Sequence, residues 1–382
     1  MQVSKIELKT FQISGFKTLF NVLKNYTKRA YFVGGSVRDF FLFGGMSKPK
    51  DIDIEVYDIN PEIFEKIMLG IGAKGVGKSF FVYKFENFDI ALARSENKIG
   101  VGHKAFEVEV CNDERMAVKR RDFSINAVMI NIFTGEICDF YGGVADIRAR
   151  VLRMVCEKTF VEDSLRVLRG AQFCARFNLK IEQNTLKIMQ KIKLDDLSKD
   201  RIRDELVKLF RAKFLAHGFK ILQILGIDEK IFGVKISDKQ NKKITGILKN
   251  SAKIVQNEMF FLYVILNFLH LDKLKILRSL NLNSVYKRIL NEPFYERVSS
   301  LALCEISSKI PLKSWLGMYS AHRVKMAKSL RIYDNRLHFK VSGDKFVKIG
   351  LNGIKIATAI KNERSKKIQK HINKIKNLKN SL

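Results

Sequence analysis

The sequence predicts an α+β protein in which a mixed α/β head of about 140 residues precedes an all-helical remainder. Two observations support this fold class. Short β-like runs alternate with helical segments up to about residue 140, and from about residue 143 the pattern is helical almost to the end. With 382 residues, the chain is long enough for two or three compact units with a sizeable buried core.

The elements of the head follow from hydrophobic patterning and turn residues. An amphipathic helix is predicted over 15–27. Four β-like runs follow, namely AYFVGG (30–35), DIDIEVY (51–57), SFFVYKF (79–85) and FDIALAR (88–94). A helix opens at Ser36 between the first two runs, and another opens at Pro61 between the second and third. After a polar stretch at 95–115, an apolar strand pair is predicted around the turn Thr134–Glu136.

The most apolar segment lies at Met259–Leu271 and predicts a core helix. Its 13 residues are too few to span a bilayer, so we expect no membrane insertion. Five cysteines show no metal-ligand spacing. An odd number of cysteines without a signal peptide predicts a reduced, cytoplasmic protein.

The charge of the chain is strongly basic and unevenly distributed. Lys and Arg number 70 against 39 Asp and Glu, a formal net charge of +31. Residues 1–200 carry 32 basic and 26 acidic side chains, so residues 201–382 hold +25 of that excess. A field of one sign and this size predicts a polyanion as partner, either nucleic acid or an anionic membrane. A proteome that is generally rich in lysine is the alternative explanation, but such a bias would also raise the net charge of residues 1–200.

Gly34, Gly35, Ser36 and Arg38 lie between a predicted strand and a predicted helix. Two glycines let the backbone approach an anion closely, the helix start offers free N–H donors, and an arginine adds positive charge. These features indicate a phosphate site, although an isolated GGxxR is more often a plain tight turn.

Asp51 and Asp53 project to the same side of a strand, because residues two apart share a face. Two like charges held this close are unfavourable unless a cation lies between them, and Mg²⁺ prefers one or two carboxylates together with phosphate oxygens. Asp89 on a neighbouring strand would complete a carboxylate trio. A solvated edge strand and a surface aspartate are the alternatives.

Two further charged groups are candidates for nucleotide contacts. Arg121 and Asp122 in RRD (120–122) pair an adjacent base and acid that suit a ribose hydroxyl and a triphosphate. Asp163, Arg166 and Arg169 recur every third residue, so on a helix they form one polar ridge that matches the hydrogen-bonding edge of a base. Taken alone, the RRD segment is more often a surface ion pair, and the ridge is as readily a salt-bridged helix surface.

Seven motifs in this order resemble those of the bacterial and eukaryotic (class II) tRNA nucleotidyltransferases, the CCA-adding enzymes, and their poly(A) polymerase relatives. The matching text is YFVGGSVRDFFL, KDIDIEVY, FDIALARSE, KRRDFSINAV, DFYGGVADIRARVLR, EDSLRVLRGAQFCARF and LSKDRIRDEL. The resemblance covers about residues 28–210, and residues 342–360 show a weaker similarity to the family's C-terminal segment. The resemblance implies a polymerase-β-like nucleotidyltransferase head at 1–140, a helical neck with the base-reading helix at 141–215, and a helical body with a basic tail that binds tRNA at 216–382.

The resemblance also implies roles for the matched residues. The triphosphate would be held by Gly34, Gly35, Ser36 and Arg38. The catalytic Mg²⁺ ions would be bound by Asp51 and Asp53, with Asp89 as third catalytic carboxylate. Sugar and phosphates would be contacted by Arg121 and Asp122.

In the neck, the resemblance implies that Asp163 and Arg166 read the base of CTP or ATP, with Arg169 supporting the nucleotide. Gln172 would be a further nucleotide-binding residue, and it stands where the family pattern has another arginine. Residues 139–150 would form the hinge between head and neck, and Arg201 and Glu205 would brace the neck helices.

The implied activity is addition of C, C and A to the 3′ end of tRNA from CTP and ATP, without a template and by a two-metal mechanism. A poly(A) polymerase with the same head and a catalytically silent RNA-binding protein are the alternatives. The segment 75–98 favours the CCA-adding enzymes, and the loop at 95–115 favours full over CC-only addition. Intact Asp51 and Asp53 disfavour a silent protein. Since the chain has no His-Asp doublet, we expect no phosphohydrolase domain.

Overall fold

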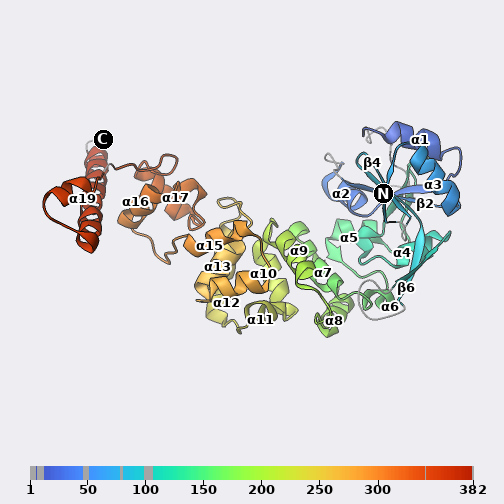
Figure 1. Ribbon diagram of the computed structural model, residues 1–382. Coiled ribbons are helices and arrows are strands. Elements are labelled where there is room, and N and C mark those ends of the chain that lie inside the picture. Colours follow the sequence, from blue (N-terminus) through green and yellow to red (C-terminus); the bar gives the residue numbers. More distant parts are fainter. Residues whose placement is uncertain are drawn as a thin grey trace. The chain divides into compact units, whose positions relative to one another are not determined.

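The computed structural model describes residues 6, 13–45, 51–77, 81–98, 106–339 and 341–380. The chain divides into two compact units, Met1–Glu205 and Leu206–Leu382. Among the described residues, all strands lie in the first unit and the second unit is helical (Figure 1), which agrees with the predicted α+β class. The finer division at residues 140 and 215 stays a prediction.

A mixed sheet forms the centre of the first unit. Among the described residues it has seven strands in the order β3 (Lys74–Gly77), β4 (Val82–Phe85), β5 (Phe88–Leu92), β2 (Ile52–Val56), β1 (Ala30–Val33), β8 (Met129–Asn131) and β9 (Ile137–Cys138). β2 and β5 run parallel, and every other pair is antiparallel. Because β2 and β1 lie in the middle of the sheet, their apolar side chains are fully covered.

The helices of the first unit begin where local sequence favours a helix start. The expected helices are α1 (Phe16–Leu23), α2 (Gly35–Phe43) and α3 (Pro61–Gly70). In α3, Pro61 stands at the first position and the Asn60 side chain accepts a hydrogen bond from Glu62 N. Further helices are α4 (Glu114–Lys119), η3 (Ser124–Asn126), α5 (Gly143–Ala149), α6 (Glu157–Phe160), α7 (Leu165–Phe177), α8 (Gln183–Lys191) and α9 (Lys199–Phe210).

Three strand pairings were not predicted. The polar stretch after residue 94 contains a hairpin of β6 (Arg94–Lys98) and β7 (Phe106–Val110), whose first strand lacks apolar alternation. Residues 99–105 of the predicted loop lie outside the described residues. The glycine-rich β3 is an edge strand, and β10 (Val151–Leu152) pairs with β11 (Lys180–Ile181) inside the helical region. Pairing with a neighbouring strand, rather than local propensity, forms these short strands.

The second unit consists of helices around apolar cores. They are α10 (Leu215–Ile224), α11 (Ile227–Phe232), α12 (Asp238–Asn250), α13 (Phe260–Phe268), α14 (Lys273–Ser279), η4 (Ser284–Lys287), α15 (Arg288–Asn291), α16 (Ser300–Lys309), η5 (Leu312–Ser314), α17 (Ala321–Ser329), α18 (Asp344–Lys348) and α19 (Gly353–Asn380). Every residue of α13 is buried, which confirms the predicted core helix. Within the described ranges, no helix is long and apolar enough to cross a bilayer.

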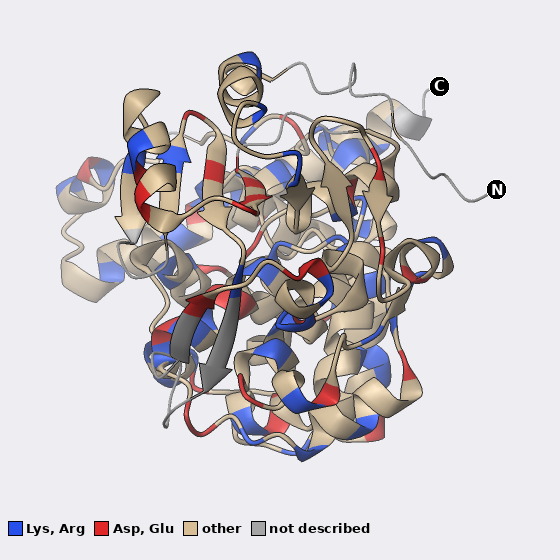
Figure 2. Cartoon of the chain, turned by 90° about the vertical axis from the view of Figure 1, so that its right-hand side faces the viewer, with Lys and Arg blue, Asp and Glu red and all other residues tan. Residues whose placement is uncertain are grey.

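The basic C-terminal helix α19 is part of this core. Ile368, Ile372 and Ile375 are buried, and the first two join a cluster with Leu303 and Cys304 of α16. Exposed lysines, among them Lys366, Lys370 and Lys374, lie on the opposite face. Over the described part of the chain, Lys and Arg are spread over many helices (Figure 2). The tail is therefore a packed helix with a basic outer face.

Candidate functional site

The three predicted carboxylates converge on one face of the sheet. In β2 the side chains of Ile52, Ile54 and Val56 are buried, so the alternate residues point to the other face. The parallel register of β2 and β5 pairs Asp53 with Asp89, and Asp51 lies two residues before Asp53. This arrangement confirms the expected neighbour relation of Asp89 to the pair.

A cation lies between two of these carboxylates. Lys84 Nζ is 3.5 Å from Asp51 Oδ1 and 3.6 Å from Asp89 Oδ1. Partial burial raises the pKa of Asp53, with Arg121 opposing this effect and the nearby Asp89 and Asp51 charges adding to it. The group therefore attracts a positive charge, which is the electrostatic requirement of a divalent metal site.

Among the described residues, no three His, Cys, Asp or Glu side chains are assembled as a complete metal cage. Mg²⁺ typically takes one or two carboxylates and completes its shell with water and substrate phosphates. Asp51 and Asp53 fit that requirement. A cavity of about 250 Å³ adjoins Asp53, and its lining includes Asp53, Asp89, Glu55, Arg94, Arg120 and Arg121 together with apolar residues of the strands.

Gly34 brings the start of α2 close to the carboxylates. Its φ of 70° lies in the region that favours glycine, and a Cβ there would be 3.0 Å from Asp53 Oδ2 and 3.7 Å from Arg121 Nη1. A side chain at residue 34 would therefore be in tight contact with Asp53 and would require a backbone conformation that favours glycine. The backbone of Gly34 and Gly35 can approach a ligand beside Asp53 only because no side chain intervenes.

The side chains of Ser36 and Arg38 are engaged inside the protein. Ser36 Oγ donates to Val33 O at 3.1 Å, and both residues are buried. Arg38 donates to Asn126 Oδ1 at 2.9 Å, and its guanidinium carbon lies 4.6 Å from the ring centre of Phe177. Their predicted contact with a triphosphate stays a prediction, since in this structure both side chains connect α2 to neighbouring elements.

Arg121 reaches the cavity because a buried glutamate holds it. Arg121 Nη2 donates to Glu55 Oε2 at 2.5 Å, and Arg120 Nη2 donates to Glu55 Oε1 at 3.3 Å. Burial alone would raise the pKa of Glu55, but the two arginines outweigh it and lower that pKa. Sequence reasoning missed Glu55, although it continues the same-face series of Asp51 and Asp53.

Asp122 is buried, and its carboxylate is bound within the protein. It accepts hydrogen bonds from Phe123 N at 2.8 Å, from Asn126 Nδ2 at 2.9 Å and from Arg169 Nε at 2.7 Å. Burial would raise the pKa of Asp122, but Arg169 and the Asn126 amide together lower it. Asp122 therefore links the end of the RRD segment to α7, and its predicted sugar contact stays a prediction.

Asn126 joins the two halves of this network. Its side-chain oxygen accepts from Arg38 of α2, and its side-chain nitrogen donates to Asp122. An unbroken series of polar contacts thus runs from α2 through Asn126 and Asp122 to Arg169 on α7. Sequence reasoning did not single out Asn126, because nothing local marks it as more than a polar residue beside an apolar strand.

The predicted base-reading residues lie at the start of α7. Asp163 Oδ1 accepts from Leu165 N at 3.2 Å and pairs with Arg201 Nη2 at 3.3 Å. Arg166 donates to the carbonyl oxygens of Thr159 at 2.8 Å and Arg120 at 2.6 Å, and burial lowers the pKa of Arg166. The Asp163 contact is consistent with the predicted bracing role of Arg201.

Gln172 lies two turns into α7 and is buried. Its side-chain oxygen accepts from Arg176 Nη1 at 3.3 Å. The Arg176 guanidinium carbon in turn lies 4.7 Å from the ring centre of Phe177. The nucleotide contact predicted for this position stays a prediction.

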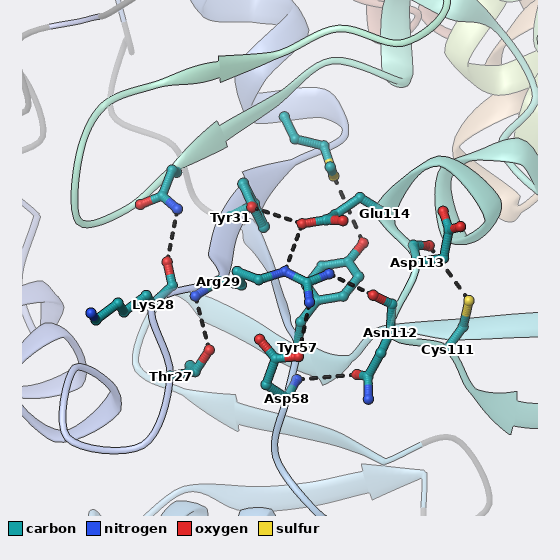
Figure 3. A network of polar contacts seen from close by, with 12 residues as sticks. Thr27, Lys28, Arg29, Tyr31, Tyr57, Asp58, Cys111, Asn112, Asp113 and Glu114 are labelled. Atoms are coloured by element: carbon teal, nitrogen blue, oxygen red, sulfur yellow. Dashed lines mark hydrogen bonds and ion pairs between the residues drawn. The ribbon is translucent and has the colours of Figure 1, made fainter.

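A second polar network fixes the segment that leads into the RRD motif (Figure 3). Arg29 donates to Glu114 Oε1 at 2.7 Å, to Asp58 Oδ1 at 2.9 Å and to Asn112 O at 2.5 Å. Tyr31 Oη also donates to Glu114, at 3.0 Å. Since Glu114 begins α4 and Arg120 follows its last residue, this network holds the helix that presents the two arginines.

Parts of this chain are similar to known proteins. Residues 30–153 match the family model of the poly(A) polymerase head domain, and residues 178–233 match a model described as a probable RNA and SrmB-binding site of polymerase A. The multifunctional CCA protein of Nitrosococcus oceani is 35% identical over 211 residues, which is 53% of this chain and 50% of that protein. The CCA-adding enzyme of Staphylococcus epidermidis is 33% identical over 215 residues, 54% of this chain and 52% of that protein.

The chain spans about half the length of the curated relatives it matches. Solved structures match over nearly the whole chain. An apo CCA-adding enzyme superposes with a TM-score of 0.67 at 22% identity and covers 98% of both chains. The Thermotoga maritima CCA-adding enzyme complexed with tRNA gives a TM-score of 0.63 at 22% identity, covering 96% of this chain and 97% of that one. These matches confirm the predicted α+β fold.

Proposed function

We propose that this chain is a member of the tRNA nucleotidyltransferase and poly(A) polymerase family and adds C, C and A to the 3′ end of tRNA from CTP and ATP. The observation that carries the proposal is the pairing of Asp53 and Asp89 across β2 and β5, beside Gly34 and Arg121. Clustered carboxylates next to a glycine backbone and an arginine supply what transfer of a nucleotide from its triphosphate requires.

Enzymes of this family generally use divalent metals, and we propose that Asp51 and Asp53 hold Mg²⁺. When bound, such ions stabilise charge on the attacking and leaving oxygens of an in-line displacement. The backbone at Gly34 and Gly35 would bind the triphosphate without steric hindrance, and Arg121 would neutralise phosphate charge from its fixed place on Glu55. Asp89, which lies beside Asp53 on the neighbouring strand, would be the third catalytic carboxylate.

We propose that Asp163 and Arg166, at the start of α7, select the base of the incoming nucleotide. A carboxylate beside a guanidinium complements the amino donor and ring-nitrogen acceptor that cytosine and adenine both present. Guanine O6 and uracil O4 are hydrogen-bond acceptors at the position where cytosine and adenine carry the amino donor, so they would face the carboxylate without a hydrogen bond. The contacts of Arg166 with two backbone carbonyls support this role, because they hold the guanidinium in one orientation.

The second unit and α19 are proposed to hold the RNA through backbone phosphates. Residues 201–382 carry most of the net positive charge, and the outer face of α19 is lined with exposed lysines. The five cysteines are free thiols, which supports the cytoplasm as the proposed location.

The test is incubation of the protein with tRNA that lacks its terminal C, C and A, supplying CTP and ATP singly and together. Sequencing of the added tails should give C and C with CTP alone, and the complete triplet with both. Tails of A alone would instead identify the poly(A) polymerase alternative, and no tail under any mixture would overturn the proposal.

A further inference from the structure

We infer that Lys84 is an internal counter-cation of the carboxylate group, which competes with a divalent metal for Asp51 and Asp89 and so weakens metal binding. The inference rests on the proposed function, since it concerns the same carboxylates. It assigns a role to a residue that neither the sequence motifs nor the proposed mechanism uses.

The position of Lys84 follows from strand register. β4 and β5 are antiparallel neighbours, and Lys84 is the direct partner of Asp89. Directly opposed side chains lie on one face of a sheet, so the lysine stem extends over the same surface that carries Asp53. From there Nζ reaches Asp89 and Asp51 at nearly equal distances of 3.6 and 3.5 Å.

This arrangement is poorly suited to stabilising the fold. The Lys84 side chain is 47% exposed and that of Asp51 is 71% exposed, and such surface pairs contribute little to folding. What the lysine does supply is one positive charge among three carboxylates that would otherwise repel one another. The ammonium therefore occupies the region of highest affinity for a cation.

A metal ion that uses Asp51 must displace Lys84 or share the carboxylate with it. The lysine stem is flexible and its head is half exposed, so it can move away without a change in the backbone. Triphosphate oxygens beside Gly34 would give the displaced ammonium a new partner. Lys84 thus favours joint binding of metal and nucleotide over binding of metal alone.

The expected size of the effect follows from Coulomb's law. A unit charge about 6 Å from a divalent ion changes its affinity about tenfold even at the dielectric constant of water. We therefore expect Lys84→Gln to bind Mn²⁺ roughly tenfold more tightly than the wild-type chain when no nucleotide is present.

The measurement is Mn²⁺ affinity of the full chain, from the free-ion signal in electron paramagnetic resonance. Lys84→Arg keeps the charge and should bind Mn²⁺ like the wild type. Lys66→Gln, at an exposed position on α3, removes the same charge elsewhere and should also leave affinity unchanged. Melting curves support the inference if adding Mg²⁺ raises the Tm of the K84Q variant more than it raises the Tm of the wild type, because the tighter binder gains more stability from the ion.

Equal Mn²⁺ affinity of the K84Q variant and the wild type would overturn the inference. An equal rise in the Mn²⁺ affinity of the K66Q variant would also overturn it, because the net charge of the chain would then explain the effect. The proposed function fails on a different result, namely the absence of added tails in the tRNA assay. The Mn²⁺ measurement does not depend on that assay.

Discussion

Asp122→Asn tests whether the buried carboxylate is the structural link between the RRD segment and α7. In the wild type, Asp122 accepts three hydrogen bonds, one of them from the charged Arg169. An asparagine keeps the size of the side chain but turns a donor toward Arg169 or Asn126. The substitution therefore leaves the fold's shape intact and removes the charge that these donors surround.

The cost can be estimated from burial. Removing one partner of a buried ion pair costs about 3–5 kcal/mol. The Arg169 side chain is 35% exposed, so water compensates it in part, and we take about 2–3 kcal/mol for this pair. In a unit of about 200 residues, each kcal/mol lowers the Tm by about 2–4 °C. The expected fall in Tm is therefore roughly 4–12 °C.

The assay is thermal unfolding of the full chain followed by calorimetry, without nucleotide. Asp195→Asn, at an exposed position in the same unit, is the matched control and should unfold like the wild type. In the double variant D122N/R169Q, the destabilisation should be smaller than the sum of the two single effects, because one interaction is removed twice. If the D122N and D195N variants melt within about 1 °C of each other, the reasoning is refuted.

The pH dependence gives the same interaction a second readout. The pKa of Asp122 is lowered in the folded protein, so its stabilising contribution is complete above the ordinary aspartate pKa and is lost as the pH falls through the lowered value. The Tm difference between the wild type and the D122N variant should thus stay constant from pH 7 to about 5 and shrink at lower pH. A difference that grows on acidification would contradict the assignment.

Three further outcomes are expected. Glu55→Gln should lower the Tm and weaken CTP binding, because Arg121 loses the anion that holds it; unchanged CTP affinity would show that Arg121 acts without Glu55. The double variant D163A/R166A should relax selection among CTP, ATP, GTP and UTP in single-turnover incorporation, and continued exclusion of GTP and UTP would place base reading elsewhere. Lys366, Lys370 and Lys374 are exposed lysines of α19, and we expect their replacement with glutamine to weaken the salt dependence of tRNA binding while CTP affinity stays unchanged. The slope of the logarithm of the binding constant against the logarithm of salt concentration should fall by about 0.7–0.9 for each phosphate that is no longer neutralised. An unaltered slope would contradict RNA binding at this face.

Much of the acidic face of β2 and β5 was predictable because strand alternation is a local property. The spacing of Asp51 and Asp53 alone places both on one side of β2, and a strand at 88–94 brings Asp89 next to them. Apolar patterning likewise identified the fully buried α13. These features depend on residues a few positions apart, which a sequence displays directly.

The supporting residues could not be found in the same way. Asn126 and Lys84 acquire their roles from partners that only the fold brings together, since Asn126 contacts α2 and Lys84 lies across a strand from Asp89. The basic tail gives a similar lesson. Its charge indicates a solvated helix, but Ile368 packs into the core of the second unit, so the lysines must be tested by substitution rather than deletion.

The central claim is that nucleotide addition takes place at the carboxylates of β2 and β5, and Asp53→Asn tests it most directly. The assay is incorporation of CMP from CTP into tRNA that lacks its terminal C, C and A, in Mg²⁺, with the D195N variant as control. Loss of a metal ligand should remove several kcal/mol of transition-state stabilisation, so addition should fall well below a tenth of the wild-type rate. The Tm at pH 7 should stay equal or rise slightly, because the raised pKa of Asp53 reflects burial and repulsion that the neutral amide relieves. A D53N variant that retains more than about a tenth of the wild-type rate would contradict the account.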